Sequence, residues 1–308
     1  MKKYGFFHEL KKNKALFLMA APSILLTFFL SYLPMSGLVL AFKNYRYDKG
    51  IFGSDWNGFD NFAYLFQSGA GWTITRNTIL YNLLNLITSQ LLAVIVAIVI
   101  SEMIGKLYKR VVQSVIFLPY FISWVIVGVF AFNLFNYETG AVNNLLHMLG
   151  MEPMNFYTAE NAWWWVIIIC CFNMWKWTGY NSIIYIAAIT SIDAECYEAA
   201  DIDGANIFQK IWYITFPAIK PTIITMILLQ VGRILRGDFE MFYQLIGSNG
   251  QLFDMTDVID TYVFRSLTTS ANLGMTAAAS FYQSALCFII IMVVNQVVRK
   301  IEEEYALF

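Results

Sequence analysis

Charged side chains are rare in this 308-residue chain, and four of them interrupt one apolar stretch: Arg233, Arg236, Asp238 and Glu240. A charge inside lipid costs about 2.5–3.5 kcal/mol, so it normally faces a cavity or a partner. The arginines could bind the hydroxyls or carboxylates of a solute in a polar cavity between helices. Alternatively, they could pair with the neighbouring acids and stabilise a distorted helix. Both interpretations stay open.

A second group of charges lies between residues 190 and 221. Five acids stand there against two lysines: Asp193, Glu195, Glu198, Asp201 and Asp203. This excess predicts a partner that offers basic groups. An ordinary solvated helix face is the alternative, because exposed ion pairs are worth only about 0–1 kcal/mol.

Other chemistry is excluded by residue type and spacing. The two histidines, His8 and His147, lie far apart, and the four cysteines lack the spacing of a zinc site or a disulfide framework. The chain has no G-x-x-x-x-G-K-[ST] phosphate loop, and no basic block of the kind that binds nucleic acid. We therefore expect no catalytic residue, metal or cofactor in this chain.

The elements that position these charges are apolar and long. Hydrophobic residues make up 58% of the chain and charged residues 13%, about half the usual share, so lipid is the expected solvent. A span needs about 20 apolar residues. Six apolar runs predict an all-α membrane protein with six transmembrane helices: 15–42, 78–101, 112–135, 162–189, 222–246 and 275–298.

Lysine and arginine counts orient these spans. Twelve lie on the side of the two termini and five on the other side, which predicts that both termini are cytoplasmic. The expected organisation is a cytoplasmic segment 1–14, a six-span transmembrane domain 15–298 and a cytoplasmic tail 299–308. Lys176, within the fourth span, is expected to snorkel toward the lipid headgroups.

The segment 190–221 then becomes a cytoplasmic loop between the fourth and fifth spans. Thr190 and Asp193 form a capping pattern that predicts a short helix. Gly204 is expected to end this helix, because glycine tolerates the left-handed conformation. A second short helix should follow from residue 205, and Pro217 and Pro221 should end it.

The register of seven residues in this loop resembles the EAA signature (EAA-x3-G-x9-I-x-L-P) of the membrane subunits of ABC importers. The matching residues are Glu198, Ala199, Ala200, Gly204, Ile214, Phe216 and Pro217. Phe216 replaces the usual leucine but keeps an apolar side chain. The resemblance implies the type I ABC importer permease fold.

Further stretches are similar to sugar-transporting members of this family. They are NGFDNFAYLF at 57–66, Arg76–Thr78, Trp177–Asn181, GDFEMFYQL at 237–245 and DVIDTYVFR at 257–265. The last two resemble permeases for complex oligosaccharides from polysaccharide or glycan breakdown. The resemblance therefore implies an oligosaccharide as the substrate class.

The resemblance also implies a set of partners. Two permease subunits form a heterodimer in the bacterial cell membrane, two cytoplasmic ATPase subunits bind ATP and Mg²⁺, and an extracytoplasmic solute-binding protein delivers the sugar. ATPase coupling is carried by the loop, at positions that here are Glu198, Ala199, Ala200, Asp203, Gly204 and Phe208.

For the sugar pathway we favour Tyr243 and Asn133, in addition to the charged cluster. Sugars stack on aromatic rings and bond to amides, so other candidates are Trp124, Tyr180, Tyr262, Asn173 and Asn181. Two rival functions stay open. One is an ABC permease for another solute, such as a phosphorylated polyol. The other is a polytopic membrane enzyme that acts on lipid-linked sugars.

Overall fold

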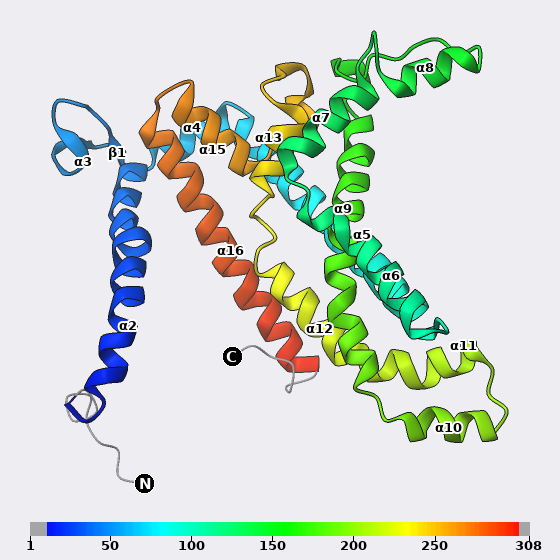
Figure 1. The fold of residues 1–308 in the computed structure, drawn as a ribbon. Helices are drawn as coiled ribbons and strands as arrows, with labels where there is room; N and C mark the ends of the chain where they lie inside the picture. Colours follow the sequence, from blue (N-terminus) through cyan, green and yellow to red (C-terminus); the bar gives the residue numbers. More distant parts are fainter. Residues whose placement is uncertain (1–10, 302–308) are drawn as a thin grey trace.

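The centre of the molecule is a pair of long helices that pack along each other. The computed structural model describes residues 11–301, most of them helical (Figure 1). Helices α5 (Ala70–Glu102) and α9 (Trp164–Thr190) make the central pair. Buried Ala93 and Ala97 on α5 leave room for Tyr185 of α9, because small residues let helices approach closely.

The other elements surround this pair. In chain order they are α2 (Lys14–Thr27), η1 (Phe28–Tyr32), η2 (Leu33–Phe42), α3 (Gly50–Gly53), α4 (Asp60–Gln67), α6 (Lys106–Phe117), η3 (Leu118–Phe121), α7 (Trp124–Phe135), α8 (Ala141–Met148), η4 (Ala159–Asn161), α10 (Ala194–Ile202), α11 (Ile207–Lys210), η5 (Ile211–Thr215), α12 (Phe216–Val231), α13 (Phe239–Ile246), η6 (Gly250–Leu252), α14 (Phe253–Thr256), α15 (Ile259–Thr268) and α16 (Leu273–Ile301). Strands β1 (Lys43–Asn44) and β2 (Asp55–Trp56) pair antiparallel.

The predicted all-α membrane class is confirmed. In the described part of the chain four helices are long and apolar enough to cross a membrane, and a bent pair could add a fifth. Helix α9 is also long, but amides and a lysine lower its hydropathy. The count of six spans therefore stays a prediction. Most of the predicted segment 1–14 and of the tail 299–308 lies outside the described residues.

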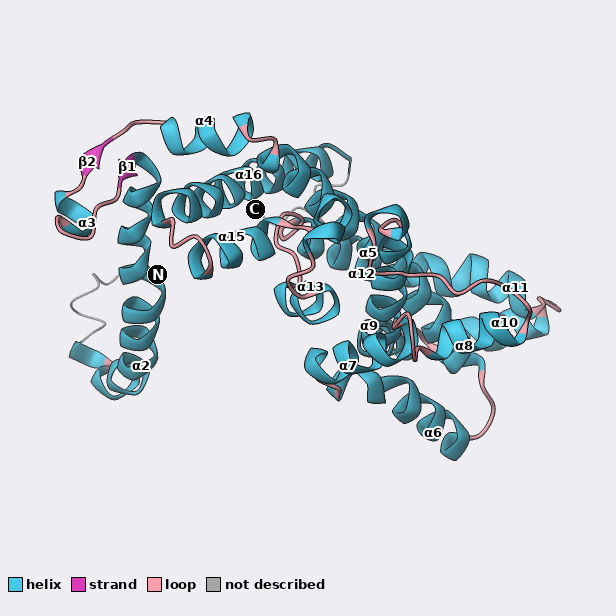
Figure 2. Cartoon of the chain, turned by 90° about the horizontal axis from the view of Figure 1, so that it is seen from above, coloured by secondary structure: helices cyan, strands magenta, loops and turns pink. Residues whose placement is uncertain are grey.

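The first span stands apart from the bundle. The run Lys14–Phe42 forms one rod whose most apolar stretch has no buried residue. Its η2 end packs against α16, whereas α2 stays clear of the other long helices (Figure 2). The face that α2 presents is therefore open to lipid or to a partner.

The third predicted span is bent. The segments Lys106–Phe121 and Trp124–Phe135 meet at 91°. A bend at membrane depth exposes carbonyls that lipid cannot satisfy. The buried ammonium of Lys176 donates to the carbonyls of Tyr120 and Ile122 there, and it lies 5.1 Å from the Trp124 ring centroid. The expectation that Lys176 snorkels to the headgroups is wrong, because the bend needs a donor.

The fifth predicted span also differs from its expected bounds. The helix is continuous over Ile207–Val231, so Pro217 and Pro221 do not end it. Pro217 follows the π-helical turn Ile211–Thr215, a local distortion of the kind that accompanies a proline inside a helix. The helix then ends at Val231 rather than at residue 246. Residues 232–238 are non-helical and lead into the separate short helix α13.

Gly179 allows α9 to touch the backbone of α6. A Cβ added at Gly179 would lie 2.6 Å from the carbonyl carbon of Ile116 and 2.8 Å from the Cα of Phe117. These are backbone atoms of a helix, so they cannot move aside as a side-chain tip could. The glycine of the stretch Trp177–Asn181 thus has a packing role.

Gly179→Ala should destabilise the protein by about 1–3 kcal/mol, because the added methyl overpacks the contact of α9 with α6. Thermal unfolding in detergent, followed by tryptophan fluorescence, would measure the change. Gly37→Ala is the matched control, since its added Cβ meets nothing within 4 Å. Equal melting temperatures for the two variants would contradict the close-packing role.

Candidate functional site

A polar cavity lies between α5, α9 and the non-helical residues 232–238. Its volume is about 750 Å³, which is within the range of small-molecule sites. Most of its lining side chains carry amide, hydroxyl or charged groups. The lining residues are Asn82, Asn85, Leu86, Ser89, Asn173, Trp177, Asn181, Leu229, Gln230, Arg233, Ile234, Arg236, Gly237 and Asp238.

Side chains from other helices satisfy the carbonyls of the non-helical segment. Asn82 of α5 donates to the carbonyl of Ile234 over 2.9 Å. Gln283 of α16 donates to the carbonyl of Leu235 over 2.6 Å and is itself buried. These bonds replace the helical bonds that the break removes, as lipid-embedded backbone requires.

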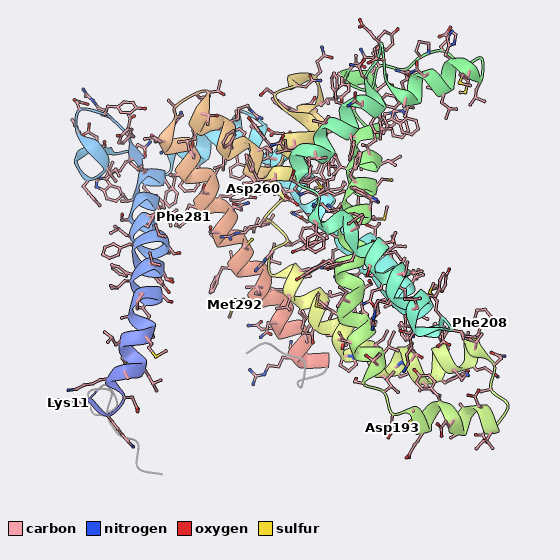
Figure 3. All side chains as sticks on the ribbon, viewed as in Figure 1. Lys11, Asp193, Phe208, Asp260, Phe281 and Met292 are labelled. Atoms are coloured by element: carbon pink, nitrogen blue, oxygen red, sulfur yellow. The ribbon has the colours of Figure 1, made fainter. Side chains whose placement is uncertain are left out.

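Asp260 of α15 completes this support from the other side. Its Oδ2 accepts a 2.7 Å bond from the backbone N–H of Gly237 and a 3.1 Å bond from Gln283. Figure 3 labels Asp260 beside α13 and α16, at the top of the break. The break is therefore held by α5, α15 and α16 together.

Asp238 joins the break in the fifth span to the bend in the third. Its Oδ1 accepts from the backbone N–H of Met241 and so caps α13, and its Oδ2 accepts a 2.9 Å bond from the indole N–H of Trp124. Trp124 begins α7 immediately after the bend. Both carboxylate oxygens of Asp238 are thus engaged by groups that carry no charge.

The predicted charge cluster is only partly gathered at the cavity. Arg233, Arg236 and Asp238 line it, whereas Glu240 is exposed outside it. Within residues 11–301 neither arginine forms an ion pair with Asp238 or Glu240. The alternative in which these neighbours pair with each other is therefore not observed.

The two residues favoured for the sugar pathway lie elsewhere. Asn133 of α7 borders a separate, mostly apolar cavity of about 930 Å³ and donates to the carbonyl of Val129. Tyr243 stacks on Phe239 at 5.3 Å and meets Phe264 edge-on at 5.1 Å. Neither residue lines the polar cavity. Asn173 and Asn181, weaker candidates from the sequence, do line it.

Three cavity residues on α5 were missed: Asn82, Asn85 and Ser89. A signal for them exists in the sequence, because they recur at helical spacing within an otherwise apolar run. Asn85 has a buried Oδ1 that finds no partner in the described chain. A polar stripe inside an apolar span indicates a wet or partnered face.

The acidic loop folds back on the base of α12. Asp193 caps α10, and Gly204 ends it with a φ of +75°, as predicted for a left-handed glycine. Lys210 pairs with Asp201 over 2.8 Å. Thr190, however, belongs to the end of α9 and is not part of the cap.

The tip of this loop exposes large apolar side chains. Phe208 is 79% exposed and Ile202 is 87% exposed. Figure 3 shows Phe208 and Asp193 at the end of the molecule where α2 begins and α16 ends, opposite α8. Of the other loop residues singled out, Glu198, Ala199, Asp203 and Gly204 are exposed and Ala200 is partly buried. An exposed apolar tip on a protruding loop is typical of a docking surface.

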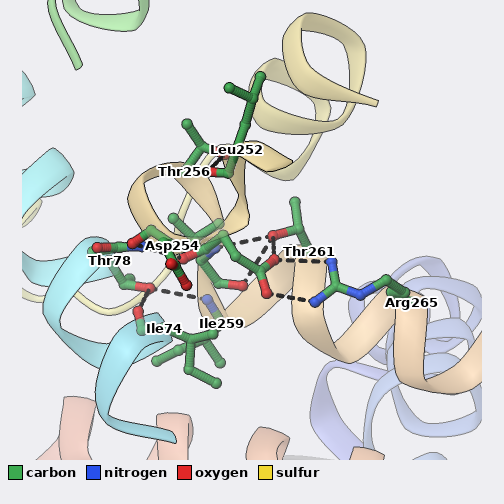
Figure 4. A network of polar contacts seen from close by, with 11 residues as sticks. Ile74, Thr78, Leu252, Asp254, Thr256, Ile259, Thr261 and Arg265 are labelled. Atoms are coloured by element: carbon green, nitrogen blue, oxygen red, sulfur yellow. Dashed lines mark hydrogen bonds and ion pairs between the residues drawn. The ribbon is translucent and has the colours of Figure 1, made fainter. Parts of the chain in front are cut away.

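At the opposite end, two stretches that matched the family meet in one network (Figure 4). Asn77 donates to the carbonyl of Asp257 over 3.0 Å, and Thr78 accepts a 2.9 Å bond from the N–H of Ile259. The buried Asp257 pairs with Arg265 through both oxygens. These stretches lie about 180 residues apart in sequence, so they fix α5 against α15. Their role here is structural.

The fold and the cavity define a polytopic helical protein with a polar compartment beside a broken span and a loop that exposes an apolar tip. A sequence profile of the binding-protein-dependent transport system inner membrane component matches residues 89–303. The chain belongs to this family of transport permeases, and it is an integral membrane protein rather than an enzyme.

Two known proteins are similar to this chain over nearly its whole length. The chain is 34% identical to protein LplB and 33% identical to the polygalacturonan/rhamnogalacturonan transport system permease protein YteP, both of Bacillus subtilis (strain 168). The alignments cover 96% of this chain in both cases, with 92% of LplB and 91% of YteP.

A solved structure has the same fold. One chain of a bacterial alginate ABC transporter, in complex with a periplasmic protein bound to an alginate pentasaccharide, superposes with a TM-score of 0.85. That chain is 33% identical, and the match covers 96% of this chain and 98% of the other. The predicted permease fold is therefore confirmed.

Gln283→Leu should destabilise the protein by about 1–3 kcal/mol, because the carbonyl of Leu235 would remain buried without a donor. Melting temperature in detergent would measure this loss. Gln251→Leu makes the same change at an exposed position and should be nearly neutral. A Gln283→Leu protein as stable as the control would show that the break does not depend on this bond.

Proposed function

We propose that this chain is one permease subunit of an ABC importer that carries an oligosaccharide across the bacterial cell membrane. The observation that carries the proposal is the polar cavity beside the broken fifth span. Its amides and hydroxyls offer the donors and acceptors that sugar hydroxyls require. The sugar polymers named for YteP and for the alginate transporter support this substrate class.

The chain would work beside a second permease subunit. The open face of the first span supports this, because its most apolar stretch buries nothing within the described chain. The polar cavity is also open on one side, so a second helical bundle would complete it. An extracytoplasmic binding protein would deliver the sugar, as in the alginate complex.

The power source would be a pair of ATPase subunits that hold ATP and Mg²⁺. The loop 190–221 would insert into them, with Phe208 as the apolar anchor and Glu198 facing a basic group. Ala199 and Ala200 would allow close approach, and Gly204 with Asp203 would form the turn. Both chain termini would then be cytoplasmic, in agreement with the lysine and arginine distribution.

Co-purification would test the assembly. We expect the tagged chain to bring with it a second membrane subunit and an ATPase. After reconstitution with the binding protein, oligosaccharide should stimulate ATP hydrolysis and enter the vesicles. Stimulation by a phosphorylated polyol but by no oligosaccharide would support the rival solute. A chain that captures no ATPase would contradict the proposal.

Phe208→Ala should lower uptake at least about tenfold, because a buried aromatic anchor at an interface is commonly worth 2 kcal/mol or more. Uptake of labelled sugar into vesicles, alongside the amount of inserted protein, would measure the effect. Leu107→Ala is the matched control, since Leu107 is an exposed apolar residue of α6 at 75% exposure. Equal uptake by the two variants would exclude a docking role for Phe208.

A further inference from the structure

We propose that Arg233 binds a carboxylate of the transported oligosaccharide, so that this permease selects acidic, uronate-containing chains over neutral ones. This inference rests on the proposed function and adds the charge of the substrate to it. It follows from the balance of charge around the polar cavity.

The one acid that lines the cavity is already engaged. Both oxygens of Asp238 accept hydrogen bonds, one from the Trp124 indole and one from the Met241 backbone. In addition, the ammonium of Lys176 interacts electrostatically with Asp238. Asp238 therefore makes no ion pair with either arginine of the cavity within residues 11–301.

The two arginines differ in their surroundings. Arg236 interacts electrostatically with Asp260, which is partly buried beside the break. Arg233 has no acidic side chain within ion-pair distance in the described chain, and its guanidinium makes no hydrogen bond there. Arg233 is thus a cation of the cavity without a counter-charge in residues 11–301.

A cation without a counter-charge is energetically costly inside a membrane protein. Charged side chains at membrane depth usually pair with one another or face a watery path that an ion or substrate takes. A guanidinium offers two parallel N–H groups that match the two oxygens of a carboxylate. A neutral sugar would leave this charge without a counter-ion.

The groups around Arg233 suit the rest of such a sugar. Asn85 has an unpartnered Oδ1, and the buried Asn181 makes no side-chain hydrogen bond within residues 11–301. Amides both donate and accept, so they can bind sugar hydroxyls of either orientation. An arginine without a counter-charge, beside these neutral amides, matches a hydroxyl-rich chain that carries carboxylates.

The test uses the whole complex, reconstituted in vesicles with its binding protein. The probes are trigalacturonate and galactotriose, which differ only in carboxylate against hydroxymethyl groups. We expect the wild type to import the acid faster than the neutral sugar. Arg233→Gln should lower import of trigalacturonate at least about tenfold, since charged hydrogen bonds are the strong ones. Arg233→Lys keeps the positive charge but lacks the two parallel N–H groups of the guanidinium, so it should retain part of the import.

Arg110→Gln is the matched control, because Arg110 is exposed on α6 and its side chain makes no hydrogen bond or ion pair with another described residue. The inference is overturned if Arg233→Gln imports trigalacturonate as the control does, or loses both sugars equally. It is also overturned if Arg233→Gln no longer binds the second permease subunit, because Arg233 would then pair with an acid of that subunit. If the wild type imports neither sugar but imports a solute that is not an oligosaccharide, the proposed function fails as well.

Discussion

A broken helix inside a membrane is possible only where every freed backbone group finds a partner, and the architecture of this permease follows from that constraint. Lipid offers no hydrogen bonds. The fifth span stops at Val231, and side chains of α5, α15 and α16 bond to the residues that follow. The third span bends, and Lys176 of α9 bonds to its free carbonyls. The hydrogen bonds that satisfy the backbone at the break and at the bend therefore also hold the helices around the cavity together.

The sequence predicted the elements that depend on local chemistry. Hydropathy located the apolar runs, because burial in lipid is a property of each run by itself. Gly204 was correctly placed at the end of α10, since a left-handed turn is set by a single residue type. The start of α10 was placed too early, because its cap is Asp193 rather than Thr190. The EAA register correctly indicated the family, which the profile match and the solved fold then confirmed.

The interruptions could not be predicted in the same way. Pro217 suggested the end of a helix that in fact continues. The real break follows Val231, where the charged residues had indicated a cavity or a distorted helix but not the point at which the helix ends. Whether a chain breaks there depends on donors more than 40 residues away, such as Gln283. The same long-range origin explains why Lys176 was assigned to the headgroups and why Tyr243 was favoured over Asn181. Which residues line the cavity depends on which helices pack against one another. The sequence of a single helix does not show its neighbours.

The continuous helix between the loop 190–221 and the polar cavity has a mechanical consequence. It begins at Ile207, beside the exposed Phe208, and ends at Val231, two residues before Arg233. Its 25 residues make a rod about 37 Å long at 1.5 Å per residue. A tilt of about 5° around the loop would carry the far end through about 3 Å, which is the scale of one hydrogen bond. A small rotation at the loop end of this helix could thus make or break a contact beside Arg233.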